Sequence, residues 1–147
     1  MSGDIASEFV GTWRLISYSA VTSGGETIYP MGRNTHGRLT YEAGGRMAVQ
    51  LADPDRAAFA ARDPRAATDA EVRAAFESYL AYYGSYTVHS DQGIIVHHLE
   101  MSLIPNWMGG DQVRYFDLQG GRLTLKTPPI LFGGAERVSS LVWEKLQ

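Results

Sequence analysis

The histidine pair His97-His98 and the nearby Glu100 are the side chains of this sequence best suited to acid and base chemistry. A histidine titrates near neutral pH and can therefore give or take a proton. The run from Ile94 to Leu103 alternates, so neighbouring side chains point to opposite faces of a strand and only one histidine can face an interior. The face of His97 is the more apolar, which favours His97 inside a filled interior. A ligand cavity needs polar groups, which favours His98 and Glu100 inward, and both orientations stay open.

Arg114 places a permanent charge on the apolar side of its strand, because it shares that side with Phe116 and Leu118. An unpaired buried charge is strongly destabilising. Arg114 is therefore expected either to pair with Glu100 on a neighbouring strand or to bind an anionic or carbonyl group of a ligand. Facing side chains on adjacent antiparallel strands lie about 5 Å apart, so an inward His98 or Glu100 could share one ligand oxygen with Arg114. These three residues are the candidate catalytic groups; for either histidine, a purely structural hydrogen bond is the alternative.

Aromatic residues supply the expected walls of a binding site. The chain has eight tyrosines, and a tyrosine offers a flat apolar face with one hydroxyl, which suits an aromatic ligand. Trp107 lies in a loop between two strands, at the position of a lid or of a packed turn. The candidate ligand-binding residues are Tyr18, Tyr41, Tyr86, His97, Trp107, Arg114 and Phe116.

Short alternating segments predict eight strands, and their links have the length of hairpin turns. The expected strands are residues 11–20, 36–41, 46–51, 85–89, 93–103, 111–118, 122–127 and 137–145. Between the third and fourth, residues 53–84 have a helical composition. Thr68 to Glu71 fits a capping box, and an apolar stripe through Val72, Phe76 and Tyr79 to Tyr83 predicts an amphipathic helix that ends at Gly84 and packs on an apolar surface.

Eight sequential antiparallel strands bury their edges best by closing on themselves. The sequence therefore predicts a mainly β protein: a single up-and-down barrel of about eight strands, with one amphipathic helix inserted between strands 3 and 4. We expect one domain over residues 1–147, with an N-terminal tail at residues 1–8. In Gly11-Thr12-Trp13 the glycine lets the backbone bend, and the indole is expected to close one end of the barrel.

Composition and missing motifs exclude several classes of function. The net charge is −3 with scattered basic residues, so no nucleic-acid or membrane partner is expected, and the absence of cysteine excludes thiolate chemistry. The sequence contains no secretory signal and no membrane span, which favours a cytoplasmic location. The four histidines lack the spacing of metal ligands, and no nucleotide fingerprint or nucleophile elbow occurs. We expect neither a metal nor a cofactor.

The chain resembles the lipocalin-like domain proteins of bacteria and fungi, within the calycin superfamily. The resemblance rests on Gly11-Thr12-Trp13-Arg14-Leu15, Gly37-Arg38-Leu39-Thr40-Tyr41, Gly45-Arg46-Met47, Tyr82-Tyr83-Gly84-Ser85-Tyr86, His97-His98, Pro105-Asn106-Trp107, Gly109, Gln112, Arg114 and Leu123-Thr124-Leu125. It covers nearly the whole chain. It implies a small barrel that holds a hydrophobic or amphipathic molecule, and it implies no single chemistry.

The sequence thus favours a protein that binds a small hydrophobic or aromatic molecule bearing a carbonyl, phenol or carboxylate inside its barrel. The alternative is a cofactor-independent isomerase, cyclase or dehydratase that acts on a natural-product intermediate, such as a polyketide, in the same cavity. A third possibility is an interaction module whose interior is filled by side chains. The sequence predicts no oligomeric state.

Overall fold

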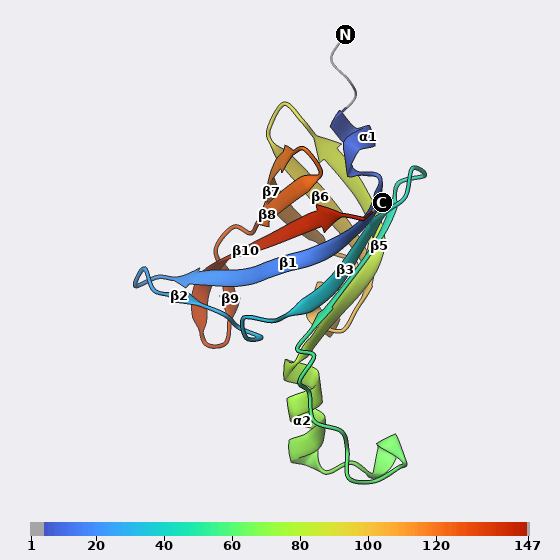
Figure 1. The fold of residues 1–147 in the computed structure, drawn as a ribbon, viewed down its shortest axis with the longest axis vertical. Helices are drawn as coiled ribbons and strands as arrows, with labels where there is room; N and C mark the ends of the chain where they lie inside the picture. Colours follow the sequence, from blue (N-terminus) through green and yellow to red (C-terminus); the bar gives the residue numbers. More distant parts are fainter. Residues whose placement is uncertain (1–4, 147) are drawn as a thin grey trace.

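A closed antiparallel barrel dominates the computed structural model, which describes residues 5–146 (Figure 1). Its eight strands follow one another around the ring in chain order, and β1 pairs with β10 to close it. The strands are β1 (Gly11–Thr22), β3 (His36–Tyr41), β4 (Arg46–Ala52), β5 (Tyr79–His89), β6 (Ile94–Ser102), β7 (Asp111–Gln119), β8 (Arg122–Lys126) and β10 (Ala135–Lys145). The predicted up-and-down barrel is confirmed.

Two short strands and two short 3₁₀ turns lie around the ring. Strand β2 (Thr27–Ile28) pairs with β1, and β9 (Ile130–Phe132) pairs with β10. Figure 1 shows both of them at the end of the barrel far from the N-terminus. The 3₁₀ turns are η1 (Pro64–Ala66) and η2 (Pro105–Trp107), and η2 follows β6 directly along the chain.

Trp13 and Phe9 close the other end of the barrel. Helix α1 (Ile5–Phe9) precedes β1, and the Trp13 indole N–H donates to the Phe9 carbonyl at 2.9 Å. Gly11 turns the chain between them at φ 137°, a conformation that side chains disfavour. Trp13 is fully buried, as predicted. Of the tail expected at residues 1–8, residues 1–4 lie outside the described part of the chain, and the rest belongs to α1.

The predicted helix exists but is shorter than expected. In α2 (Asp69–Glu77) the Thr68 hydroxyl accepts from the Glu71 N–H at 3.2 Å, and the Glu71 carboxylate accepts from the Thr68 N–H at 2.8 Å, so the capping box is confirmed. The extension to Tyr83 is wrong: residues 79–89 form β5, paired on both sides with β4 and β6. Two ladders of backbone hydrogen bonds outweigh a local helical pattern.

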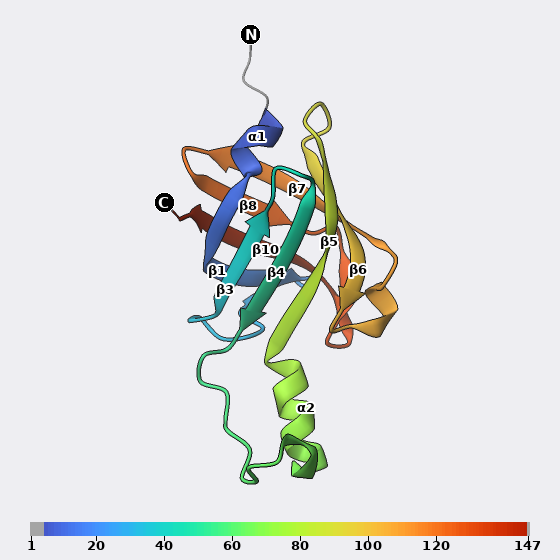
Figure 2. The same ribbon diagram turned by 90° about the vertical axis from the view of Figure 1, so that its right-hand side faces the viewer.

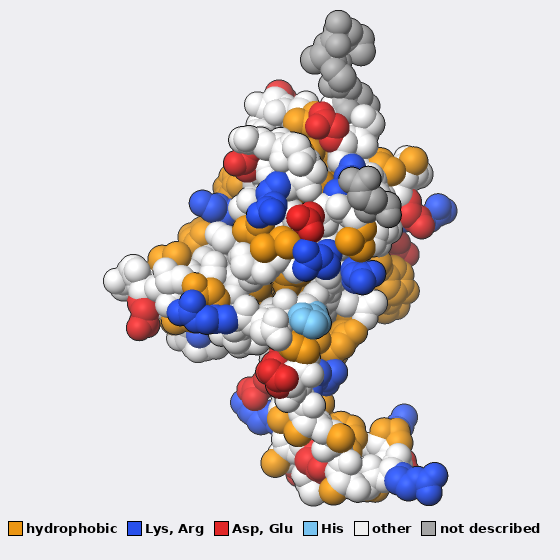
Figure 3. All heavy atoms as spheres, viewed as in Figure 1, with side chains coloured by type: hydrophobic (Ala, Val, Ile, Leu, Met, Phe, Trp, Pro, Cys, Tyr) orange, Lys and Arg blue, Asp and Glu red, His pale blue; other side chains and the backbone are white. Residues whose placement is uncertain are grey.

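The expected packing of this helix on an apolar surface is also wrong. No residue of α2 is buried, and Val72 and Phe76 are 51% and 47% exposed. Figure 2 shows α2 and the segment before it extending beyond the barrel, and Figure 3 shows apolar side chains among charged ones over this part. Of the insertion expected at residues 53–84, only the portion before β5 leaves the barrel.

Candidate functional site

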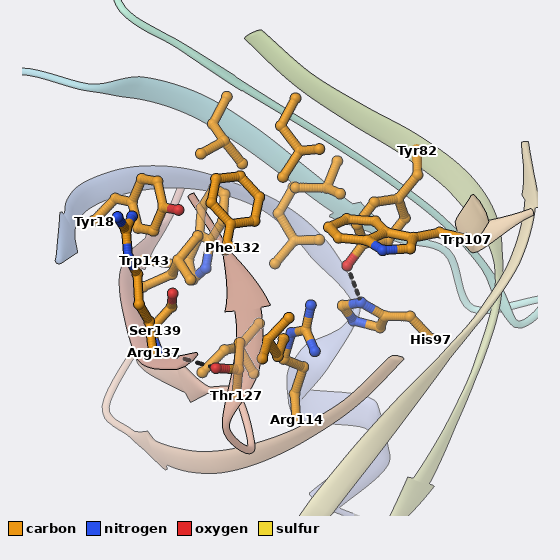
Figure 4. A pocket seen from close by; sticks show the side chains of 17 residues that line it. Tyr18, Tyr82, His97, Trp107, Arg114, Thr127, Phe132, Arg137, Ser139 and Trp143 are labelled. Carbon is orange, nitrogen blue, oxygen red and sulfur yellow. Dashed lines mark hydrogen bonds between the residues drawn. The ribbon is translucent and has the colours of Figure 1, made fainter. Parts of the chain in front are cut away.

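The barrel encloses a cavity whose free space, measured for the centre of a water-sized sphere, is about 60 Å³. Seven of the seventeen residues that line it are aliphatic: Leu39, Val49, Leu51, Leu80, Leu125, Ile130 and Leu141. Polar side chains interrupt this surface at a few places, which Figure 4 labels. The interior is therefore not completely filled by side chains.

His97 projects from β6 to the inside of the barrel and is 2% exposed. Its Nδ1 lies 2.7 Å from the hydroxyl of Tyr82 on β5, and its Nε2 lies 2.6 Å from the hydroxyl of Tyr41 on β3. Burial, together with the positive charge of Arg114, holds the pKa of His97 well below its usual range. The imidazole is therefore neutral at pH 7, and one ring nitrogen donates while the other accepts.

The hydrogen-bond partners of Tyr41, His97 and Tyr82 determine which ring nitrogen of His97 carries the proton. Burial raises the pKa of both tyrosines, so both hydroxyls keep their protons. Tyr41 is enclosed, and its hydroxyl finds its partner in His97 Nε2. When Tyr41 donates to Nε2, Nδ1 carries the ring proton and donates to Tyr82. The Tyr82 hydroxyl proton is then directed at the cavity, which Tyr82 lines.

Arg114 lies beside this group, on the inward face of β7, and is 8% exposed. Its guanidinium donates to the Val113 carbonyl at 2.9 Å and to the Gln112 side-chain oxygen at 3.3 Å. The expected ion pair with Glu100 does not form, since none of the ion pairs between described residues involves Arg114. The cavity wall therefore holds a positive charge whose hydrogen-bond partners are neutral.

His98 and Glu100 lie on the outer surface, so the interpretation that turned them into the cavity is wrong. His98 contacts the Thr87 hydroxyl and the Asp111 carboxylate, each at 2.8 Å, and Glu100 is exposed beside an outer groove. The reason is the pleat of β6: once His97 faces inward, the residues one and three positions further along face outward.

The candidate aromatic residues divide into two sets. Tyr18 lines the cavity, and so does Trp107 of η2, whose ring meets Tyr82 edge to face at 6.4 Å. Tyr41, Tyr86 and Phe116 do not line it. The Tyr86 ring packs on Tyr41 at 4.7 Å with its hydroxyl on the Glu42 carbonyl, and Phe116 packs on Phe9 at 5.0 Å. These rings fill the closed end of the barrel beneath His97.

Among the polar residues of the cavity wall that sequence reasoning missed are Tyr82, Arg137 and Trp143. Tyr82 was hidden by its assignment to a helix. Strand alternation could have predicted the other two. Every second position of β10 between residues 137 and 143 lines the cavity: Arg137, Ser139, Leu141 and Trp143.

Two features are absent from residues 5–146. No group of three or more histidine, aspartate or glutamate side chains is placed there to hold a metal ion. No helix in the same part of the chain has the length and apolar character needed to cross a membrane.

The barrel and its internal cavity define a protein of the lipocalin-like class, and the chain belongs to the lipocalin-like domain family, whose model matches residues 10–146. It is 34% identical, over 107 residues, to the 4'-hydroxy-3'-methoxypropiophenone carrier protein ppsC of Aspergillus oryzae; the match covers 68% of this chain and 96% of that protein. The resemblance predicted from the sequence is confirmed.

Two solved structures are also similar. One is a lipocalin-like protein from Bacteroides uniformis ATCC 8492, at 12% identity and a TM-score of 0.49, covering 95% of this chain and 99% of that one. The other is an uncharacterized protein from Bacteroides eggerthii DSM 20697, at 12% identity and a TM-score of 0.46, covering 94% and 99%.

Proposed function

We propose that this protein is a carrier whose barrel binds a small aromatic molecule through a carbonyl, carboxylate or phenol oxygen held by Arg114 and Tyr82. The observation that carries the proposal is the charge of Arg114, which lines an apolar cavity and lacks an ion-pair partner among the described residues. A ligand oxygen would accept from the guanidinium and from the Tyr82 hydroxyl together. Such charge-assisted hydrogen bonds are among the stronger polar contacts in proteins.

The named relative supports an aryl ketone as the ligand class. The name of ppsC states that it carries 4'-hydroxy-3'-methoxypropiophenone, a molecule with one aromatic ring and one ketone. A ring of this kind suits the leucine-rich wall and the edge of Trp107. A ketone oxygen suits two converging hydrogen-bond donors.

A calorimetric titration tests the proposal with two matched probes: 4'-hydroxy-3'-methoxypropiophenone and 2-methoxy-4-propylphenol, which lacks the ketone. We expect the ketone to bind about tenfold or more tightly, because a hydrogen bond to a charged group contributes about 1.5–3 kcal/mol. Glu100→Gln, a change on the outer surface, serves as the control and should bind both probes like the parent protein. No binding of either probe at millimolar concentration contradicts the proposal, and equal affinity for the two probes contradicts the ketone as the group that Arg114 and Tyr82 hold.

The catalytic alternative, a cofactor-independent isomerase, cyclase or dehydratase, uses the same wall. One feature supports this alternative: the neutral His97 is hydrogen-bonded to the Tyr82 hydroxyl, and the positive charge of Arg114 lies close to both. For this step His97 would take the other tautomer, with Nε2–H donating to Tyr41. The Tyr82 oxygen would then accept the α-proton while its own hydroxyl proton passed to Nδ1, and Arg114 would stabilise the enolate oxygen. Deuterium exchange at the α-carbon of propiophenone in D₂O, followed by NMR, measures this step. Exchange that Tyr82→Phe abolishes would favour the enzyme, and exchange at the uncatalysed rate excludes this proton transfer.

A further inference from the structure

Two hydrogen-bond donors of the cavity wall have no partner within the described part of the chain: the Trp143 indole N–H and the Arg137 Nε–H. Both atoms are shielded from solvent, and Trp143 as a whole is 1% exposed. Buried donors without a partner are rare, because each one has lost its hydrogen bonds to water and gained nothing in exchange. Two such donors on one strand of one cavity point to a group that is bound there.

These donors lie across the barrel from Tyr82 and His97, which with Arg114 form the first polar wall of the cavity. Trp143 and Arg137 belong to β10, whereas Tyr82 belongs to β5. In the closed ring of eight strands, β5 and β10 are four strands apart in either direction, so they stand opposite each other. Figure 4 shows the same separation, with Tyr18, Arg137 and Trp143 on one side of the cavity and Tyr82 and His97 on the other.

The two unpartnered groups of this second wall are hydrogen-bond donors. An indole N–H and a guanidinium N–H can donate but cannot accept. No ion pair among the described residues includes Arg137, so its charge is also available. Leu141 and Phe132 line the cavity near these groups and would exclude water from a contact made there. A hydrogen-bond acceptor such as an ether, carbonyl or phenol oxygen fits this wall.

We infer that the cavity has a second polar subsite, in which the Trp143 indole N–H donates to an acceptor oxygen at the far end of the ligand. The unpartnered Arg137 Nε–H lies six residues away on the same strand and adds a further donor to this wall. The ligand class is then an aromatic molecule with an oxygen acceptor at each end: one for Arg114 and Tyr82, the other for Trp143. This inference rests on the proposed function of the cavity and adds the specificity for the second oxygen.

Two aryl ketones of nearly equal size test the subsite: 4'-methoxypropiophenone, which has an acceptor oxygen opposite the ketone, and 4'-ethylpropiophenone, which does not. We expect the methoxy compound to bind the parent protein about fivefold or more tightly, since one net hydrogen bond contributes about 1 kcal/mol. Trp143→Phe should reduce this ratio toward one. Glu100→Gln should leave the ratio unchanged.

NMR of the parent protein gives a second readout that does not depend on a variant folding. The Trp143 indole N–H resonance, assigned through its nuclear Overhauser contacts, should move downfield with the methoxy probe and much less with the ethyl probe. Equal affinities for the two probes with an unmoved indole resonance overturn the subsite but leave the proposed function standing, because the ethyl probe still reports on the ketone wall. Binding of neither probe overturns both.

Discussion

Tyr82 and His97 meet inside the barrel at 2.7 Å although their backbones are not partners in the β5–β6 ladder, where His97 pairs with Tyr86 and Tyr82 with Ser102. The contact is made by side chains on the inner face of two neighbouring strands, and Tyr41 completes it from β3. A buried neutral imidazole is thereby held at both nitrogens. The strength of this arrangement depends on the imidazole staying unprotonated.

The stability of the protein should therefore fall in mild acid because of His97. Its pKa is well below 6.5 in the folded chain and near 6.5 in the unfolded chain, so below pH 6.5 the unfolded chain binds a proton that the folded chain does not. The contribution of His97 to the free energy of unfolding is complete above pH 6.5 and decreases by up to about 1.4 kcal/mol for each pH unit below it. Urea melts from pH 7.5 to 5 measure the slope.

The matched variants are His97→Gln, which should flatten this slope, and His36→Gln at an exposed position, which should keep it. An identical slope in the parent protein and in His97→Gln contradicts the assignment of a neutral buried imidazole.

Arg114→Met should weaken ligand binding and leave the stability of the protein nearly unchanged. The guanidinium donates to two neighbours in its own strand and forms no ion pair among the described residues, so the melting temperature should stay within a few degrees. Affinity for an aryl ketone should fall by about 2 kcal/mol or more, the scale of a lost charge-assisted hydrogen bond. Native mass spectrometry and calorimetry measure the binding. Arg38→Met, at an exposed position, is the control, and undiminished affinity of Arg114→Met would rule out the proposed contact.

Trp13→Ala should be strongly destabilising. The indole is fully buried at the closed end and bonds to the Phe9 carbonyl. Truncation of a large buried aromatic residue costs about 3–5 kcal/mol. Trp13→Phe keeps most of the volume and loses only the hydrogen bond, so it should be less destabilising. Denaturant melts give both values; a loss below about 1 kcal/mol for the alanine variant would mean that Trp13 does not hold the barrel closed.

Gly84→Ala should destabilise the barrel through backbone contact. A methyl group at Gly84 would overlap the carbonyl oxygen of His98 on β6, next to the irregularity of the β5–β6 register. Overpacking of this kind costs about 1–3 kcal/mol. Gly44→Ala is the control, because the methyl group there meets only the end of the Arg46 side chain at an ordinary distance of 3.8 Å. Equal urea midpoints for the two variants would contradict the close approach.

The sequence by itself determined the barrel. The alternation of β1 and the glycine-containing turn between β3 and β4 are local features, and hairpins between sequential strands follow from them. The capping box at Thr68 and Glu71 is local as well, and it placed the start of α2 correctly. The end of α2 was not determined by the local sequence. Tyr79 and Tyr83 have a spacing that suits a helix, and only the pairing of β5 with β4 and β6 makes them strand residues.

The tertiary structure alone decided the site. Strand periodicity states that His97 and His98 face opposite ways, but the direction of the interior is set when β1 pairs with β10 and the sheet closes. Hairpin pairing places Tyr82, His97 and Arg114 on three neighbouring strands, and closure of the sheet turns their shared face inward and brings Trp143 opposite them. Closure depends on contacts between residues far apart in the chain, and the local spacing of residues in the sequence does not determine such contacts.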